Sequence, residues 1–153
     1  SFFYRIDRLL DWSNKSGMQL TNATAAIKAA GLFGFGVGNT PIYIPEAHTD
    51  FIFSIFASNF GLLGASFLIL CICLFDFGLI YLASKCNNKS HRYIIIGFIT
   101  MILYQQIQNI GMNIGLLPIT GITLPFISYG GSSLISYMIG IALVLNYDNN
   151  YAN

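Results

Sequence analysis

Three side chains that can accept or donate a proton, Glu46, His48 and Asp50, fall within the stretch IPEAHTDFIF, directly before a long apolar segment. A carboxylate within hydrogen-bond reach of a hydroxyl group can accept its proton, so Asp50 suits the role of a general base. The imidazole of His48 titrates near neutral pH and could share or orient that proton. Glu46 and His48 are equally typical of solvated loop residues that only shape a site.

Asp50 also fits two other roles. An aspartate just before a helix is a good N-cap, because its side chain accepts hydrogen bonds from the free amides of the first turn. Carboxylates bind divalent cations as well, so Asp50, together with Glu46, could hold a divalent cation. The residue types alone leave base, cap and metal ligand open.

The chain as a whole has the composition of a membrane protein. Of its 153 residues, 55% are hydrophobic and 8% are charged, whereas charged residues make up about a quarter of a typical soluble domain. The net charge of +1 indicates no nucleic-acid partner. We therefore predict an all-α polytopic membrane protein. Because the chain opens at Ser1 without an initiator methionine or a signal peptide, we expect it to be a fragment of a longer protein.

Residues 1–50 differ from the rest of the chain, since they hold four of its seven basic and four of its six acidic residues. We expect this part to form an extracellular loop region outside the hydrocarbon. Within it, the segment from Asn22 to Phe33 predicts a short interfacial helix capped by Asn22. The glycine-rich segment from Gly31 to Pro41 should end that helix in a tight connection.

Residues 51–153 predict the transmembrane region of a single larger membrane domain, with about three helices over 51–83, 93–117 and 131–147. The first apolar run is longer than one span, so its first turns should project beyond the hydrocarbon or tilt. The loop 84–92 carries three basic residues and no acidic one, which is typical of the cytoplasmic side. Residues 84–92 and the C-terminus then lie inside, and residues 1–50 and 117–130 outside.

Amide side chains line one face of the second predicted helix. Gln105, Asn109 and Asn113 recur at i, i+4 and i+8, which places them above one another. Amides do not face lipid without cost, so this face should contact protein or a wet cavity. Bonding between helices and contact with a substrate both explain it. The pattern GMNIG from Gly111 to Gly115 would also permit close approach of another helix.

An uncharged stretch from Leu117 to Ser133 follows, with two prolines and three glycines. Irregular backbone at membrane depth is tolerated where protein or water satisfies its amides, so we expect a re-entrant or cavity-lining loop. Amides at a helix start favour an anion, which makes a group of residues in SYGGSS candidates for binding one: Ser128, Gly130, Gly131 and Ser132. Candidate cations for the same task are Lys28, Arg5 and Arg8, and Lys28 also fits a lipid-headgroup anchor.

The strings LFGFGVGN, IPEAHTDFIF and NIGMNIGLLPITGITLPFISYGGSS resemble the C-terminal part of the SEDS family, the RodA/FtsW/SpoVE proteins of bacterial elongation, division and sporulation. The resemblance runs from about Arg5 to Leu145 and corresponds to the large extracellular loop and the last three helices of that family. It implies that Asp50, in the string HTD, is the essential aspartate, with Glu46 and His48 beside it. One departure is that FASNFGLLG has Ser58 and Asn59 where the family usually has glutamates.

The resemblance implies a peptidoglycan glycosyltransferase of the bacterial cytoplasmic membrane. Such an enzyme polymerises lipid II with inversion and works with a class B penicillin-binding protein as transpeptidase. The fragment alone should be inactive, because most of the cavity would lie in the remaining helices. Two alternatives come from other classes: a flippase or transporter of lipid II, and a membrane scaffold without catalysis. A flippase for a pyrophosphate should line its path with basic residues through the membrane, which the predicted spans lack.

Overall fold

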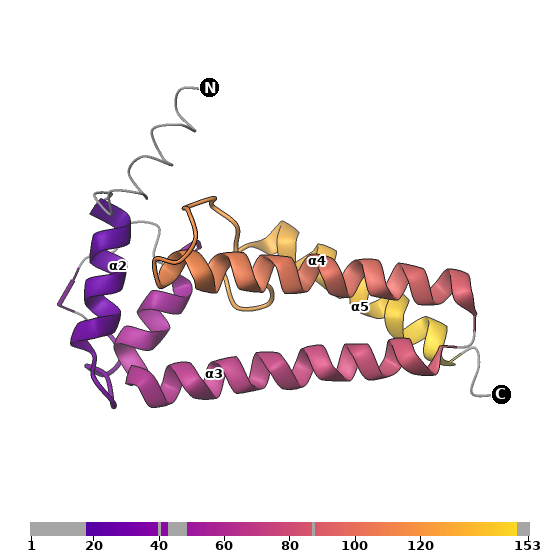
Figure 1. Cartoon of the computed structure of the whole chain (residues 1–153), viewed down its shortest axis with the longest axis horizontal. Coiled ribbons are helices and arrows are strands. Elements are labelled where there is room, and N and C mark those ends of the chain that lie inside the picture. Colours follow the sequence, from indigo (N-terminus) through magenta and orange to yellow (C-terminus); the bar gives the residue numbers. More distant parts are fainter. Residues whose placement is uncertain (1–17, 40, 43–48, 87, 150–153) are drawn as a thin grey trace, which may run out of the picture.

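The computed structural model describes residues 18–39, 41–42, 49–86 and 88–149. These residues form four helices and no strand: α2 (Met18–Ala29), α3 (Ile52–Lys85), α4 (Lys89–Asn113) and α5 (Gly131–Asn149). Helices α3 and α4 run antiparallel along the length of the molecule, α5 lies alongside them, and α2 packs across the end opposite the α3–α4 turn (Figure 1). The predicted all-α class is confirmed.

Two of the helices, α3 and α4, are long and apolar enough to cross a membrane. The part of α5 from Gly131 to Asn146 is a shorter apolar helix. Helix α4 begins and ends earlier in the chain than the expected range of 93–117. Its start is set by Asn88, whose side chain accepts a hydrogen bond from the backbone amide of Ser90 at 3.0 Å.

The end of α4 is set by Gly115. This glycine has φ +80°, and its amide bonds to the carbonyl of Met112 at 3.1 Å while the amide of Leu116 bonds to that of Gly111 at 2.8 Å. The two bonds form a Schellman motif, in which a left-handed glycine ends the helix. The GMNIG pattern therefore ends a helix. Leu117 of the same chain covers Gly111, whereas Gly115 faces Leu20 and Thr24 of the neighbouring helix α2, so the predicted close approach of another helix occurs at Gly115 and not at Gly111.

Helix α3 is interrupted at Gly61, which has the non-helical angles φ 68° and ψ −165°. The amides of Leu62 and Leu63 turn away from their helical partners and donate to the carbonyls of Gly31 and Leu32, at 3.0 and 3.2 Å. On the other side of the break, the carbonyls of Ser58 and Asn59 lack helical partners. They accept hydrogen bonds from the backbone amides of Phe35 and Gly36, at 3.0 Å each. The glycine-rich loop after α2 thus inserts into the break in α3 and satisfies both sides of it.

The close approach of the two backbones requires glycine on each side of the break. A Cβ atom at Gly34 would lie 2.3 Å from the carbonyl oxygen of Asn59, and one at Gly61 would lie 2.4 Å from that of Leu32. Both glycines also have positive φ, which side chains other than glycine rarely adopt. The bend explains how an apolar run too long for one span is accommodated.

The expectation that Asn22 caps the interfacial helix is wrong, because α2 already includes Met18 and Asn22 lies within its second turn. The helix packs on α3 through small side chains, since Ala23 and Ala26 are fully buried against Phe51. At the other end of the molecule, a core of α3, α4 and α5 residues surrounds Ile102 and Val144. Asp76 on α3 accepts a hydrogen bond there from Gln106 of α4 at 3.0 Å.

Candidate active site

The backbone of Asp50 is held by two amide side chains of α4. Asn109 and Asn113 each donate from Nδ2 to the carbonyl oxygen of Asp50, at 2.9 and 3.0 Å. Both asparagines are fully buried, with 0% of their surface exposed. Because a carbonyl oxygen has two lone pairs, the two bonds saturate it. The predicted amide face of α4 therefore serves to hold the chain at Asp50.

The same asparagines bind the neighbouring segments. Asn109 also donates to the carbonyl of Ile122 at 2.8 Å, and the Oδ1 atom of Asn113 accepts from both the amide and the hydroxyl of Ser54 on α3. Ser54 is fully buried as well. Helix α4 thus connects the start of α3 to the loop 117–130 through one buried polar network, in which each amide atom meets its partners.

Ser128 holds the residue before Asp50. Its hydroxyl donates to the carbonyl of Thr49 at 2.7 Å and accepts from the amide of Leu124 at 2.8 Å. The peptide groups on both sides of the Asp50 Cα atom are therefore fixed, one by Ser128 and the other by the asparagines. A backbone fixed on both sides of a residue is an arrangement that pre-organises a reacting group.

The carboxyl group of Asp50 faces the loop 117–130. An added Cβ atom at Gly121, which has φ +72°, would lie 3.4 Å from Oδ2 of Asp50. Asp50 is half-buried, so its carboxyl group is neither sealed in the protein nor fully solvated. The N-cap residue of α3 is Phe51, whose own side chain makes no capping hydrogen bond, and Asp50 lies one residue before it. A half-buried carboxylate on a fixed backbone can accept a proton from a hydroxyl group bound beside it.

The remaining predicted site residues lie in three places. Gln105 is half-buried, and its Oε1 atom accepts a hydrogen bond from Tyr137 of α5 at 2.9 Å. Gly130, Gly131 and Ser132 form the start of α5, where the hydroxyl of Ser133 donates to the carbonyl of Gly130 at 3.0 Å. Glu46, His48, Arg5 and Arg8 lie outside the described residues.

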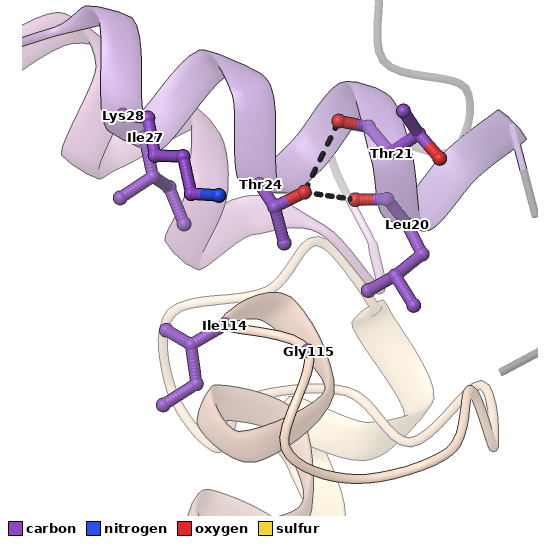
Figure 2. A pocket seen from close by; sticks show the side chains of 7 residues that line it. All are labelled: Leu20, Thr21, Thr24, Ile27, Lys28, Ile114 and Gly115. Carbon is purple, nitrogen blue, oxygen red and sulfur yellow. Dashed lines mark hydrogen bonds between the residues drawn. The ribbon is translucent and has the colours of Figure 1, made fainter. Parts of the chain in front are cut away.

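Lys28 lines a separate pocket of about 290 Å³ between α2 and the end of α4. Figure 2 shows its side chain, and those of Thr24 and Leu20, facing Ile114 and Gly115. The hydroxyl of Thr24 donates to the carbonyls of Leu20 and Thr21, at 2.8 and 3.2 Å. Among the described residues, Asp50 is not part of this lining.

Within the described ranges, no three or more histidine, cysteine, aspartate or glutamate residues gather in a group that could hold a metal ion. Asp50 itself could contribute one oxygen ligand, and its predicted companion Glu46 lies outside those ranges. Sequence reasoning missed Asn113, Ser54 and Gly121 as parts of the site. Asn113 had a signal in the i, i+4, i+8 spacing of amides, whereas Ser54 and Gly121 had none.

Comparison with known proteins assigns this chain to a family. The family model described as cell cycle protein, for FtsW, RodA and SpoVE, matches residues 2–153. The probable peptidoglycan glycosyltransferase FtsW of Hydrogenovibrio crunogenus is 40% identical over 94% of this chain and 39% of its own length. The stage V sporulation protein E of Bacillus subtilis is 37% identical over 94% of this chain and 42% of its own length.

Two solved structures have the same arrangement of helices. A chain from a peptidoglycan synthase complex that coordinates polymerization and crosslinking matches with a TM-score of 0.77 at 30% identity, covering 98% of this chain and 43% of that one. The rod shape determining protein RodA of Thermus thermophilus, solved as an aspartate-to-alanine mutant, matches with a TM-score of 0.69 at 35% identity, covering 84% and 40%. The chain thus spans about two fifths of the length of these relatives. It belongs to the FtsW/RodA/SpoVE family of cell cycle proteins, the SEDS family.

Proposed function

We propose that the full-length protein containing this chain is a peptidoglycan glycosyltransferase that polymerises lipid II, and that Asp50 is its general base. The observation that carries the proposal is the fixed backbone on both sides of Asp50, held by Asn109, Asn113 and Ser128. Relatives that share about 40% of the sequence are named probable peptidoglycan glycosyltransferases, which supports the reaction class.

The proposed reaction joins the 4-hydroxyl of one sugar to the anomeric carbon of another. Asp50 accepts the proton of the hydroxyl, the oxygen forms the new glycosidic bond with inversion, and the bond to undecaprenyl pyrophosphate breaks. A carboxylate fixed in this way contributes by proximity as well as by basicity, since the attacking hydroxyl needs one defined direction. His48 and Glu46, just before it in the chain, would orient that proton or shape the loop.

The departing pyrophosphate carries negative charge, which the protein must offset. Our candidates within this chain are the amides at the start of α5, around Gly130, Gly131 and Ser132, and the cation of Lys28. Helix starts favour anions through their free amides and dipole. A divalent cation held by Asp50 would supply charge neutralisation at the pyrophosphate, with Glu46 as a second ligand.

The proposed orientation places the Asp50 end of the molecule at the outer surface of the bacterial cytoplasmic membrane and the loop 84–92 inside, in line with its basic residues. A class B penicillin-binding protein would then meet the glycan on the same side. One similar solved structure is a peptidoglycan synthase complex, which supports a partner of this kind. We expect the 153 residues alone to be inactive.

Transport of lipid II is the alternative from another class, and the charges of the two long helices argue against it. Their basic residues are confined to the ends that meet the loop 84–92: Lys85, Lys89 and Arg92. Among the described residues, the buried amides that sequence reasoning considered for a substrate path bond to the protein backbone instead. A pyrophosphate would meet no cation over most of the depth of this part of the membrane.

One experiment distinguishes polymerisation from transport. The full-length protein and its partner are reconstituted into vesicles with lipid II, and two products are measured in the same sample: glycan chains, and lipid II that has crossed to the other leaflet. We expect glycan chains without accelerated crossing. Crossing without glycan chains would overturn the proposal in favour of a flippase, and neither product would favour a scaffold.

A further inference from the structure

A groove lies between α3 and α4 at the end of the molecule away from Asp50. It has a volume of about 500 Å³ and is lined by residues near the turn that joins the two helices. This turn lies at the end of the molecule opposite α2 (Figure 1). Its walls are mainly apolar, with Ile80 on α3 and Ile96, Ile99 and Leu103 on α4. The mechanism proposed above uses none of these residues.

A cation lies at one end of this groove. The guanidinium of Arg92 is part of the lining and donates from Nε and Nη2 to the carbonyl of Cys86, at 3.1 and 2.7 Å. Because a guanidinium has five N–H donors, these two bonds leave three for another acceptor while fixing the direction of the group. Lys89 is exposed one turn before it, and the segment 84–92 contains no acidic residue.

The dimensions of the groove match one leaflet of a bilayer. From Leu62, after the bend, to Lys85 helix α3 rises about 35 Å at 1.5 Å per residue. The hydrocarbon core of a bilayer is about 30 Å thick, so the basic end of the helices reaches the headgroups. Along α4, the groove extends from Arg92 to Leu103, a rise of about 16 Å, which is close to half of that thickness.

We propose that this groove binds an anionic diacyl phospholipid, with its phosphate on Arg92 and one acyl chain against Ile96, Ile99 and Leu103. Basic pockets between helices at the headgroup level bind acidic lipid head groups, and a guanidinium binds phosphate through two parallel hydrogen bonds. A zwitterionic lipid lacks the net negative charge that the basic segment 84–92 attracts. The site is separate from Asp50 and does not rest on the glycosyltransferase activity.

The proposal is tested with the full-length protein in mild detergent micelles supplied with phosphatidylglycerol and phosphatidylcholine in equal amounts. Native mass spectrometry measures how much of each lipid stays bound. We expect a preference for phosphatidylglycerol, and we expect Arg92→Gln to reduce that preference about fivefold, the factor that one basic residue near an anionic headgroup contributes. Equal retention of the two lipids by the wild type would overturn the proposal. This result is expected if another helix of the full-length protein fills the groove.

Two further variants distinguish the effect of filling the groove from the effect of added bulk elsewhere and from a change in the turn. Thr100→Phe adds a ring to the groove wall and leaves the bonds of Arg92 to Cys86 in place, so it should also reduce phosphatidylglycerol retention. Leu74→Phe adds similar bulk on an exposed part of α3 outside the groove and should retain the lipid. Full retention by Thr100→Phe, or an equal loss in Leu74→Phe and Thr100→Phe, would overturn the proposal.

Discussion

The side chain of Asn109 donates a hydrogen bond to the carbonyl oxygen of Asp50 at 2.9 Å, across 59 residues of sequence. The bond joins the middle of the amide face of α4 to the residue that we propose as the base. Its partner Asn113 reaches the same oxygen from one turn further along. The position of Asp50 therefore depends on the rotation of α4.

Asn109→Asp should disrupt the site although it changes the shape of the side chain little. It replaces an NH2 group that donates to two carbonyls, those of Asp50 and Ile122, with an oxygen that repels them. Leaving buried polar groups without partners costs about 1–3 kcal/mol each, so we expect a loss of unfolding free energy of that order and a fall in glycan synthesis. Thermal unfolding of the full-length protein in detergent measures the first effect.

The matched control for this change is Gln105→Glu, one turn earlier on the same helix. The Oε1 atom of Gln105 accepts from Tyr137, and a glutamate there can still accept that bond. We expect a smaller loss of stability than for Asn109→Asp. Equal losses of unfolding free energy in the two variants would mean that any acid on this face destabilises α4. The bonds to Asp50 would then contribute no more to stability than the bond to Tyr137.

Ser54→Ala should cost about 1 kcal/mol of unfolding free energy, because it deprives the buried Oδ1 atom of Asn113 of one of its two donors from Ser54. Ser66→Ala, on the same helix, removes a hydroxyl that only bonds back to the carbonyl of Leu62 on an exposed face. We expect that control to change stability little. If the two serine variants unfolded at the same temperature, the bond between α3 and Asn113 would not stabilise the site.

Gly61→Ala should be strongly destabilising, with a loss of at least about 2 kcal/mol from the left-handed backbone and the contact with Leu32. Gly78 lies in the regular part of α3, where nothing lies within 4 Å of an added Cβ atom. Gly78→Ala should therefore be neutral or slightly stabilising, since alanine favours the helix by about 1 kcal/mol. A harmless Gly61→Ala would mean that α3 can run straight without the inserted loop.

The pair of Asp76 and Gln106 predicts a double-mutant result. Both side chains are buried, and Gln106 donates to Asp76 at 3.0 Å. Gln106→Leu leaves a buried carboxyl group without this donor and should destabilise the protein. Adding Asp76→Leu removes the second polar group as well and should recover much of that loss, because an apolar pair needs no partner. A double variant less stable than Gln106→Leu would contradict this interpretation.

Several features of this fold could be predicted from the sequence because they depend on local patterns. Apolar runs longer than 20 residues indicate helices that cross a membrane, and the spacing of Gln105, Asn109 and Asn113 predicts a shared face. The acceptors of these amides could not be predicted. The carbonyl of Asp50 lies 59 residues from Asn109 and 63 from Asn113, and no local pattern encodes such a pairing.

Other features were obscured because one local pattern fits two structures. The apolar run after Asp50 continues without a polar signal through Gly61, so the break in α3 becomes visible only when the loop from Gly31 to Gly36 is placed against it. Gly111 and Gly115 fit both a helix-packing pattern and a helix end, and the positive φ of Gly115 shows that α4 ends there. Asn22 fits both a cap and a helix interior, and the helix-forming residues before it extend α2 past it.

The most direct test of the account compares Asp50→Asn with Asp76→Asn in the full-length protein with its partner. Asp50→Asn removes one negative charge beside a backbone that stays fixed by Asn109 and Asn113, whose bonds go to the carbonyl and not to the carboxyl group. Asp76→Asn makes the same carboxyl-to-amide change on α3, away from the site, and keeps an oxygen that can accept from Gln106. Glycan chain formation from lipid II is measured for both, together with unfolding temperature and partner binding. The account predicts no polymer from Asp50→Asn and polymer from Asp76→Asn, with both proteins folded and bound to the partner; polymer formed by Asp50→Asn at the wild-type rate would contradict it.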